Sequence, residues 1–416
     1  MDCTKKTRRK NRMIDGVIFT FMLAMISAVT LQLFYMQTLG GVDSDMKAYI
    51  LEMQGLESGY SFPYPVFFKL AALVHLFASP ELSVVIALVL MNGMAMVVTK
   101  LSFNRLALER FDDSHVLPWY VGVILSLLTV SLFFISMLYP PNGIYLPGIR
   151  FRYLGVFTAN PFHNATYMAA RPFAILAFLW YGKLLNVYEE GIGNKGKDYL
   201  LFALFLFAAT MTKPSFTLVM VSGAGLLMLY RLIRSGFKTL VPTIQLGLCF
   251  VPTFLALLYQ YAGVFVPKEG EEGGMGFCFG AVWAEYCDNI PLGIGLAMGF
   301  PLLVLLLNWK EVKKNTLFRF SWLLYLVSFA EAFLLYEKGF RRVDFNFSWG
   351  YMYGIFFCHF SSLRLLMQLT ADSRMKEGDG RKGRRWVLLV QWLAYFWHVL
   401  CGILYFRDLL AGGTYY

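Results

Sequence analysis

The sequence predicts an all-α protein that crosses a membrane many times. Of its 416 residues, 58% are hydrophobic and only 15% are charged, whereas about a quarter of the residues of an average soluble domain carry a charge. Several apolar runs reach the roughly 20 residues that a helix needs to cross the hydrocarbon core. About eleven spans would use half of the chain, so we expect one integral membrane domain over residues 1–416.

The net charge of +11 indicates membrane orientation and gives no reason to expect a nucleic acid partner. The basic residues gather in short segments between apolar runs, which is the orientation signal of membrane proteins. The tail 1–15 and the loop 370–385 are the most basic segments, so we expect both in the cytoplasm. The opening apolar run is too long for a cleavable signal peptide and is expected to remain as the first span.

The expected spans follow from the apolar runs taken in order. Residues 198–230 are too many for one span, and Pro214 divides them because proline cannot continue a helix; Lys213 then lies at the outer face. The eleven spans are expected at 16–39, 82–103, 118–139, 173–187, the two parts of 198–230, 240–264, 291–309, 320–336, 351–369 and 386–406.

Several segments are then extracytoplasmic, among them the loop 337–350. The first loop, 41–81, includes an apolar but short stretch at 66–77, which we interpret as a helix lying along the membrane surface. The loops 140–172 and 265–290 follow on the same side. The last one contains Cys278 and Cys287, and their spacing is compatible both with a disulfide and with two free thiols.

Acidic side chains in the first loop are candidates for catalysis. Asp43 and Asp45 directly follow the first span, and one carboxylate beside an acceptor hydroxyl can take the proton that the hydroxyl loses when it attacks a sugar. The alternative is structural: the two residues form a solvated turn or cap the helix that begins near Met46.

Basic side chains on the expected outer face are unusual under the same orientation rule. Each one alone is typical of a membrane anchor, but together they are suited to an anionic headgroup, since guanidinium groups match phosphate oxygens in pairs. These residues are Arg150, Arg152, Arg171, Lys213, Lys338, Arg341 and Arg342. We expect a lipid-linked phosphate at this face, with His163 and Asn164 placed to hold a sugar hydroxyl or the phosphate.

The motifs of the first loop resemble a known family. A first span, then Asp45-x-x-x-Tyr49, Gly59 and the pair Tyr64-Pro65, is similar to the polyisoprenyl-phosphate-sugar-dependent glycosyltransferases of the GT-C fold. The segments NPFHNATYMAARPF, Lys213-Pro214-Ser215 and EKGFRR…NFSWG are similar to bacterial membrane proteins of polysaccharide loci. The resemblance covers the topology of the whole chain, and we expect this chain to differ from many members in lacking a soluble C-terminal domain.

The resemblance implies an inverting transfer of a sugar from a polyprenyl-phosphate donor to a glycan or lipid-linked acceptor. Asp45 would be the base and Asp43 its helper or a ligand of a divalent metal. Because the acids here are spaced Asp-Ser-Asp rather than adjacent, both the choice of acid and the use of a metal stay open. The substrate-binding residues would be Arg341, Arg342, Lys213, Arg171, Arg152, His163, Asn164 and Tyr64. The expected location is the bacterial inner (plasma) membrane, with a role in cell-envelope polysaccharide biosynthesis.

Other functions are compatible with the same pattern. A polysaccharide polymerase or ligase would use a lipid-linked glycan in the same chemistry. A lipid-linked oligosaccharide flippase or another transporter would need polar residues through the bilayer midplane or paired broken helices. An acyltransferase that uses His163 is the third alternative.

Overall fold

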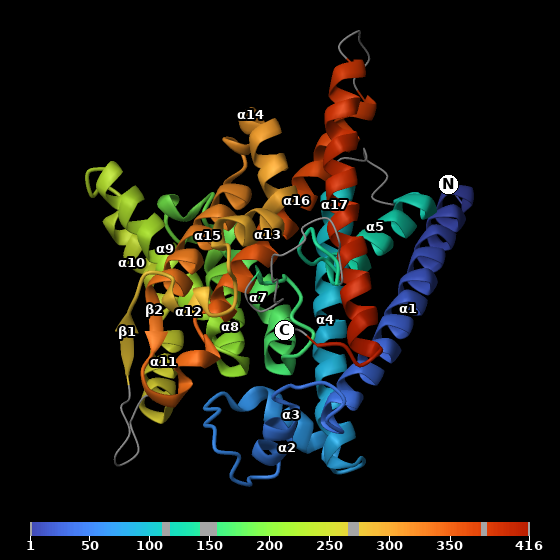
Figure 1. Cartoon of the computed structure of the whole chain (residues 1–416). Helices are drawn as coiled ribbons and strands as arrows, with labels where there is room; N and C mark the ends of the chain where they lie inside the picture. The colour runs from blue at the N-terminus through green and yellow to red at the C-terminus, as the bar shows by residue number, and fades with distance from the viewer. Residues whose placement is uncertain (1, 110–116, 142–155, 265–273, 376–380, 415–416) are drawn as a thin grey trace.

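The computed structural model describes residues 2–109, 117–141, 156–264, 274–375 and 381–414. These residues form a bundle of α-helices with very little other secondary structure (Figure 1). The α-helices are α1 (Asp2–Thr38), α2 (Met46–Met53), α3 (Pro65–His75), α4 (Pro80–Leu108), α5 (Trp119–Leu132), α7 (Ala165–Leu184), α8 (Gly196–Thr212), α9 (Ser215–Arg234), α10 (Leu240–Leu248), α11 (Val251–Val264), α12 (Ala281–Ala284), α13 (Ile290–Leu307), α14 (Trp309–Val312), α15 (Thr316–Leu334), α16 (Ser348–Met375) and α17 (Arg381–Leu410). Short 3-10 helices are η1 (Tyr188–Glu190), η2 (Gly193–Lys195) and η3 (Gly339–Asp344), and the strands are β1 (Met275–Phe277) and β2 (Leu335–Glu337).

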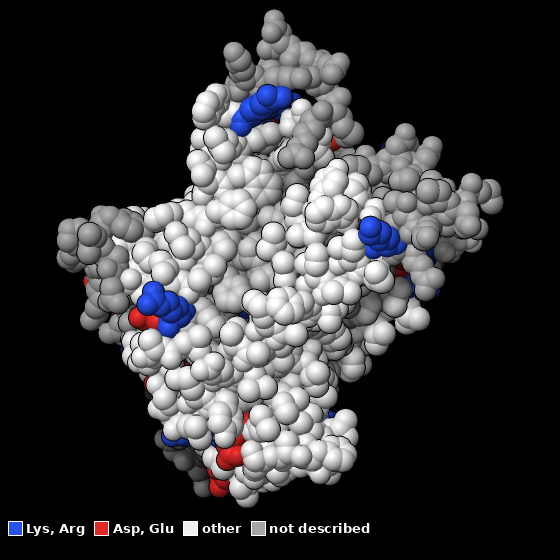
Figure 2. All heavy atoms as spheres, turned by 90° about the vertical axis from the view of Figure 1, so that its right-hand side faces the viewer, with Lys and Arg blue, Asp and Glu red and all other residues white. Residues whose placement is uncertain are grey.

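The chain is a multi-pass α-helical membrane protein, as its composition predicts. Six of the described helices are long and apolar enough to cross a membrane, namely α1, α4, α9, α13, α15 and α17, and the pair α10 and α11, bent by 49°, would make a seventh. The face that carries α1 shows a broad surface with very few charged side chains (Figure 2). Exposed apolar residues such as Phe21, Met25 and Ile124 belong to helices α1 and α5, and such side chains are suited to contact lipid.

The expected number of eleven spans is not confirmed. Each predicted span coincides with a helix or with the bent pair, but α5 has 14 residues and α8 has 17. At about 1.5 Å per residue these two helices are about 21 and 26 Å long, less than the ~30 Å hydrocarbon core. Helices α7 and α16 are not among the helices that are apolar enough to cross a membrane. They carry polar side chains, which face other parts of the protein.

Side-chain caps explain where several helices begin. The side chains of Ser79, Asn164, Asn289 and Asn315 each accept a hydrogen bond from a backbone N–H of the first turn of α4, α7, α13 and α15, respectively. These caps satisfy N–H groups that have no partner inside the helix. The cap at Asn164 makes α7 begin at Ala165, whereas the sequence analysis placed the start of this span at residue 173.

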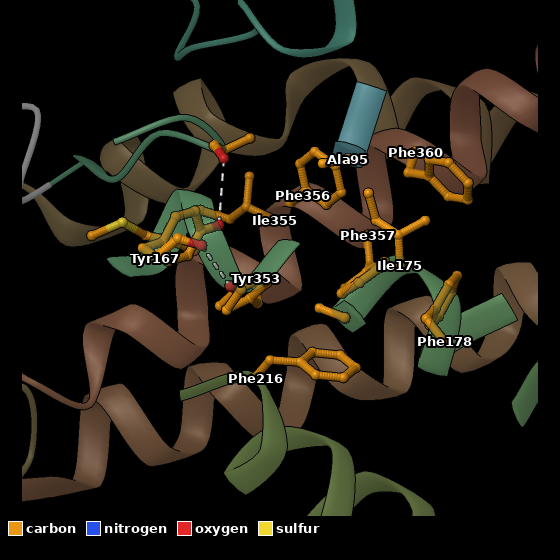
Figure 3. Packing of buried hydrophobic residues seen from close by; sticks show 14 of the residues in the cluster. Ala95, Tyr167, Ile175, Phe178, Phe216, Tyr353, Ile355, Phe356, Phe357 and Phe360 are labelled. Carbon is orange, nitrogen blue, oxygen red and sulfur yellow. Dashed lines mark hydrogen bonds between the residues drawn. The ribbon is translucent and has the colours of Figure 1, made fainter. Parts of the chain in front are cut away.

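The core of the bundle is built by aromatic side chains of α7 and α16 (Figure 3). The rings of Phe178 and Phe357 lie 4.3 Å apart between centroids, and those of Tyr167 and Tyr353 lie 4.2 Å apart. The Tyr353 hydroxyl donates to the carbonyl of Tyr167 at 2.8 Å, so its polar atom is satisfied inside the core. This packing fixes the N-terminal end of α7 relative to α16.

The helices of the predicted first outer loop lie at one end of the bundle. Helices α2 and α3 lie at this end, and α14 and the beginning of α17 lie at the opposite end (Figure 1). The predicted surface helix at 66–77 is present as α3. Strand β1 pairs antiparallel with β2, which brings the loop before α13 next to the segment that carries η3. Cys278 and Cys287 are both free thiols.

Candidate active site

A cavity of about 600 Å³ opens at the end of the bundle where α2 and α3 lie. Its walls come from segments far apart in the chain: the first loop, the residues before α7, the break between α8 and α9, helix α11, and the segment from β2 to the start of α16. Six of the predicted site residues line it, namely Asp45, Tyr64, His163, Asn164, Lys213 and Arg341. The acidic residue after the first span and the basic residues from far downstream therefore share one cavity.

Asp45 presents one free carboxylate oxygen to this cavity. It occupies the N-cap position of α2, but its side chain makes no capping hydrogen bond, so the interpretation as a helix cap is wrong. Its Oδ2 atom accepts hydrogen bonds from the Tyr49 hydroxyl at 3.0 Å and from Asn164 Nδ2 at 2.9 Å. Among the described residues no hydrogen bond reaches Oδ1, which is left for a ligand.

Lys213 brings a buried cation to the same cavity. It lies in the break between α8 and α9, and Pro214 follows it as predicted. Its Nζ atom donates to Thr166 Oγ1 at 3.1 Å and lies 4.9 Å from the ring centroid of Trp349. Burial lowers the pKa of Lys213 to about 8, an effect that Asp45 opposes and Arg341 increases.

Arg341 belongs to a small charged group on η3. Its Nε atom lies 3.3 Å from Glu337 Oε2 and 3.4 Å from Asp344 Oδ2, and Asn346 donates to Glu337 Oε2 at 2.8 Å. Burial raises the pKa of both carboxyl groups, and Arg341 opposes the shift. Within the described chain the hydrogen bonds of this guanidinium group run through Nε, so its two Nη groups are available to an anionic ligand.

Apolar side chains of α9 and α11 also line the cavity. They are Leu218 on α9 and Phe254, Leu257 and Leu258 on α11. Phe254 and Leu258 are 49% and 66% exposed, so this part of the lining is continuous with the apolar outer surface of the bundle. The cavity lining thus includes both charged side chains and exposed apolar ones, and the latter are suited to contact lipid.

His163 lies in the cavity wall but is almost completely buried. Burial lowers its pKa to about 3, and the neighbouring Lys213 contributes to the shift. The imidazole is therefore neutral at physiological pH. A neutral ring with so low a pKa is a poor base, although it can still form hydrogen bonds with a ligand.

Two of the predicted basic residues are elsewhere. Arg171 is completely buried inside α7, where it donates to Asn160 Oδ1 at 2.7 Å and lies against the rings of Phe133, Tyr167 and Phe356. The prediction that Arg171 binds substrate is wrong for this reason: the early start of α7 places it in the core.

Arg342 does not line the cavity but pairs with Glu285 at 3.3 Å, with half of its side chain exposed. Asp43 is exposed and does not line the cavity. The predicted substrate-binding residue Arg152 lies outside the described residues.

The sequence analysis missed several residues of the site. Tyr49 and Thr166 contact the predicted residues directly, and Glu337 and Asp344 pair with Arg341. Tyr49 had a usable signal, because residues at positions i and i+4 of a helix face the same side and Asp45 precedes it by four. Thr166 had no such signal, since its contacts with Tyr49 and Lys213 come from two distant segments.

The residues present do not fit a divalent metal held by Asp43 and Asp45. Within the described part of the chain no group of three or more His, Cys, Asp and Glu side chains is arranged to hold an ion. One oxygen of Asp45 is already occupied by two hydrogen-bond donors, and Asp43 is not among the residues that line the cavity.

No protein-family model matches this chain, and no curated protein or solved structure is significantly similar to it. The function therefore has to be argued from the cavity and from the chemistry of its walls.

Proposed function

We propose that this protein is an inverting membrane glycosyltransferase that moves a sugar from a polyprenyl-phosphate donor to an acceptor hydroxyl. The observation that carries the proposal is the composition of one cavity. Its lining includes a carboxylate with a free oxygen, two cations, and apolar side chains that are partly exposed on the outside of the bundle. A ligand that fits both kinds of side chain has a charged head and a hydrocarbon tail.

Asp45 is proposed as the base. The acceptor hydroxyl gives its proton to Asp45 Oδ1 while its oxygen attacks the anomeric carbon of the sugar. The bond from that carbon to the phosphate oxygen breaks, and its electron pair leaves with the phosphate. Because attack and departure occur on opposite faces of the sugar, the configuration at the anomeric carbon is inverted.

Lys213 and the free Nη groups of Arg341 are proposed to hold the phosphate. A leaving phosphate needs no proton, so cations that stabilise its growing charge are sufficient. Glu337 and Asp344 hold the other side of the Arg341 guanidinium and so orient its Nη edge. The aromatic rings of Tyr64 and Trp349 beside Lys213 offer flat apolar faces for the sugar.

The same observations weigh against two of the alternatives. An acyltransferase that uses His163 as base would need a more basic imidazole, because burial lowers its pKa to about 3. A flippase would need a polar path through the bundle, whereas the polar lining described here gathers at one end. We further propose a bacterial plasma membrane location, with this end of the bundle on the extracytoplasmic side.

The test is sugar transfer by the full chain in lipid vesicles, with a panel of polyprenyl-phosphate hexoses and pentoses as donors. Asp45→Asn is expected to lower kcat by about 10²–10⁴-fold, the usual contribution of a general base, with unchanged elution volume and melting temperature. Glu57→Gln is the matched control, since Glu57 is an exposed acid of the same loop that does not line the cavity.

Full activity of a folded Asp45→Asn variant would refute the proposal for this residue. If Asp43→Asn loses transfer activity instead, Asp43 is the base. If only His163→Ala loses activity, acyl transfer is favoured. Turnover of a diphosphate-linked glycan without turnover of any monophosphate sugar would favour the polymerase or ligase.

A further inference from the structure

We infer that Tyr49, Asn164 and Thr166 are positioning residues, which together fix one oxygen of Asp45, aim the other at the ligand, and couple Asp45 to Lys213. The inference rests on the role proposed for Asp45 and adds the residues that make this role depend on the rest of the cavity. Asn164 was expected to bind substrate; its contacts assign it to the carboxylate instead.

The orientation of the Asn164 side chain follows from its position at the start of α7. Its Oδ1 atom accepts from the backbone N–H of Tyr167 at 2.9 Å and from the Thr166 hydroxyl at 3.0 Å. Two donors on this side exclude the flipped amide, since an NH₂ group cannot accept their hydrogen bonds. The Nδ2 atom must therefore face Asp45, to which it donates at 2.9 Å.

Tyr49 is held just as firmly on the other side. It is completely buried, and its ring packs against those of Phe62, Phe67 and Phe68 with centroids 5.2–6.1 Å away. Burial and the nearby Asp45 raise the pKa of Tyr49 well above its usual value. The hydroxyl therefore keeps its proton and remains a donor to Asp45 Oδ2.

Thr166 connects these groups to the cation. Its buried hydroxyl accepts from Lys213 Nζ at 3.1 Å, donates to Asn164 Oδ1 at 3.0 Å, and lies 3.2 Å from the Tyr49 hydroxyl. An ammonium group has no lone pair, so Lys213 can only donate to this hydroxyl, whose own proton goes to Asn164. The cation is thus linked to the carboxylate through Thr166 and then Asn164, so a change at Lys213 alters the hydrogen bonds that hold Asp45.

Several other charged or titratable groups face this network. Arg341, Glu337 and Asp344 come from the segment around η3, Tyr64 from the start of α3, and His163 from the segment before α7. Each of these groups affects the charge around Asp45, but none of them makes either of the two hydrogen bonds that Asp45 accepts. A test of the positioning role must therefore remove the hydrogen bonds and leave these groups in place.

Three nearly isosteric substitutions do this. Tyr49→Phe removes a donor to Asp45. Asn164→Asp keeps the cap of α7, because aspartate caps as well as asparagine, but replaces the donor by a like charge. Thr166→Val removes the connecting hydroxyl, and Thr166→Ser restores it. The matched controls are Tyr395→Phe and Thr129→Val, whose buried hydroxyls bond to Ser131 and to the carbonyl of Leu125.

In the transfer assay we expect Tyr49→Phe to lower kcat about ten-fold, because Asp45, the proposed base, loses a hydrogen bond to its charged group. KM should change by less than about two-fold, because no other group loses a hydrogen bond to a charge. Thr166→Val is expected to lower kcat and raise KM together, because Lys213 also loses a partner. Thr166→Ser should recover both constants, and the two controls should equal the natural chain. Equal kinetics of Tyr49→Phe, Thr166→Val and the controls would overturn the inference.

A second readout needs no transfer activity. A hydrophobic carbodiimide modifies carboxyl groups in their protonated form, and peptide mass mapping measures its rate at Asp45. The two donors shield Oδ2 of Asp45 from the reagent, so we expect Tyr49→Phe to react about ten-fold faster and Asn164→Asp faster still. Unchanged rates would overturn the inference even in an active enzyme. Changed rates in a chain that transfers no sugar would support the network and refute the glycosyltransferase.

Discussion

Lys213 shows how one side chain is tuned by its surroundings. It lies in the break between two helices, 7% exposed, with Thr166 as its hydrogen-bond acceptor and the rings of Tyr64 and Trp349 nearby. Burial removes water from the ammonium group and lowers the pKa of Lys213 to about 8. The residue that is proposed to hold the donor phosphate thus changes charge just above physiological pH.

We predict that kcat/KM for the donor falls by about ten-fold between pH 7 and pH 9 as Lys213 loses its proton. The sign follows from the direction of the shift: the charged form exists below the lowered pKa and disappears above it, and the pH dependence of kcat/KM reports groups of the free enzyme. Lys213→Arg should keep a flat profile over this range because a guanidinium stays charged. A similar fall in Lys213→Arg would assign the pH dependence to another group.

The sequence predicts the members of the site better than their contacts. Asp45, Lys213 and Arg341 could be predicted because the orientation rule makes charged residues on one face exceptional. Arg171 was selected by the same rule, but it is buried in the core. Helix α7, capped by Asn164, begins eight residues before the predicted start of this span. Whether a charge faces a cavity or the core depends on a helix boundary, and boundaries are the least predictable part of an element.

At the scale of elements, the helices were predictable and their pairing was not. Apolar runs and prolines located nearly every helix, including the break at Lys213 and the surface helix α3. The pairing of β1 with β2 joins residues about sixty positions apart, and no local pattern indicates such a contact. This pairing sets the position of Glu337 and the following η3, so it also orients Arg341.

A buried ion pair shows how helices α1, α4 and α5 are held together. Lys100 on α4 donates to Asp15 Oδ1 on α1 at 2.8 Å and to the carbonyl of Gly122 on α5 at 2.8 Å. Gly122 is required by this contact: a Cβ atom at that position would lie 2.6 Å from the carboxyl carbon of Asp15. The three helices meet at a point where only glycine leaves room for the carboxylate.

We predict that Gly122→Ala lowers the free energy of unfolding by about 1–3 kcal/mol, the usual cost of overpacking a filled site. The displaced carboxylate would also weaken the contact with Lys100. Gly16→Ala on α1 is the control, because nothing lies within 4 Å of a Cβ atom there and alanine is the better helix former. Melting temperatures in detergent micelles measure both, and an equal value for the two variants would contradict the role of Gly122.

At the scale of the whole molecule, the charges divide the bundle into two ends. Exposed basic residues such as Arg234, Lys313 and Lys314 follow or precede helices at the end opposite to α2 and α3. Between the ends, the face that carries α1 shows few charges (Figure 2). The cavity and the basic segments lie at opposite ends of the bundle. The orientation rule for basic segments therefore predicts on which side of the membrane the cavity lies.

We predict that the cavity faces the extracytoplasmic side, because short basic segments are retained in the cytoplasm. A single cysteine is placed at the exposed Gln54 beside the cavity end, or at the exposed Lys314 on the basic end, in a chain whose own six cysteines are replaced by alanine. In intact cells a membrane-impermeant maleimide should label Gln54→Cys, whereas Lys314→Cys should react only after permeabilisation. The reverse pattern would put the carboxylate and the two cations on the cytoplasmic side, where a soluble nucleotide sugar would compete with a lipid-linked donor. The result therefore decides which donor the cavity can meet, independently of any assay of transfer.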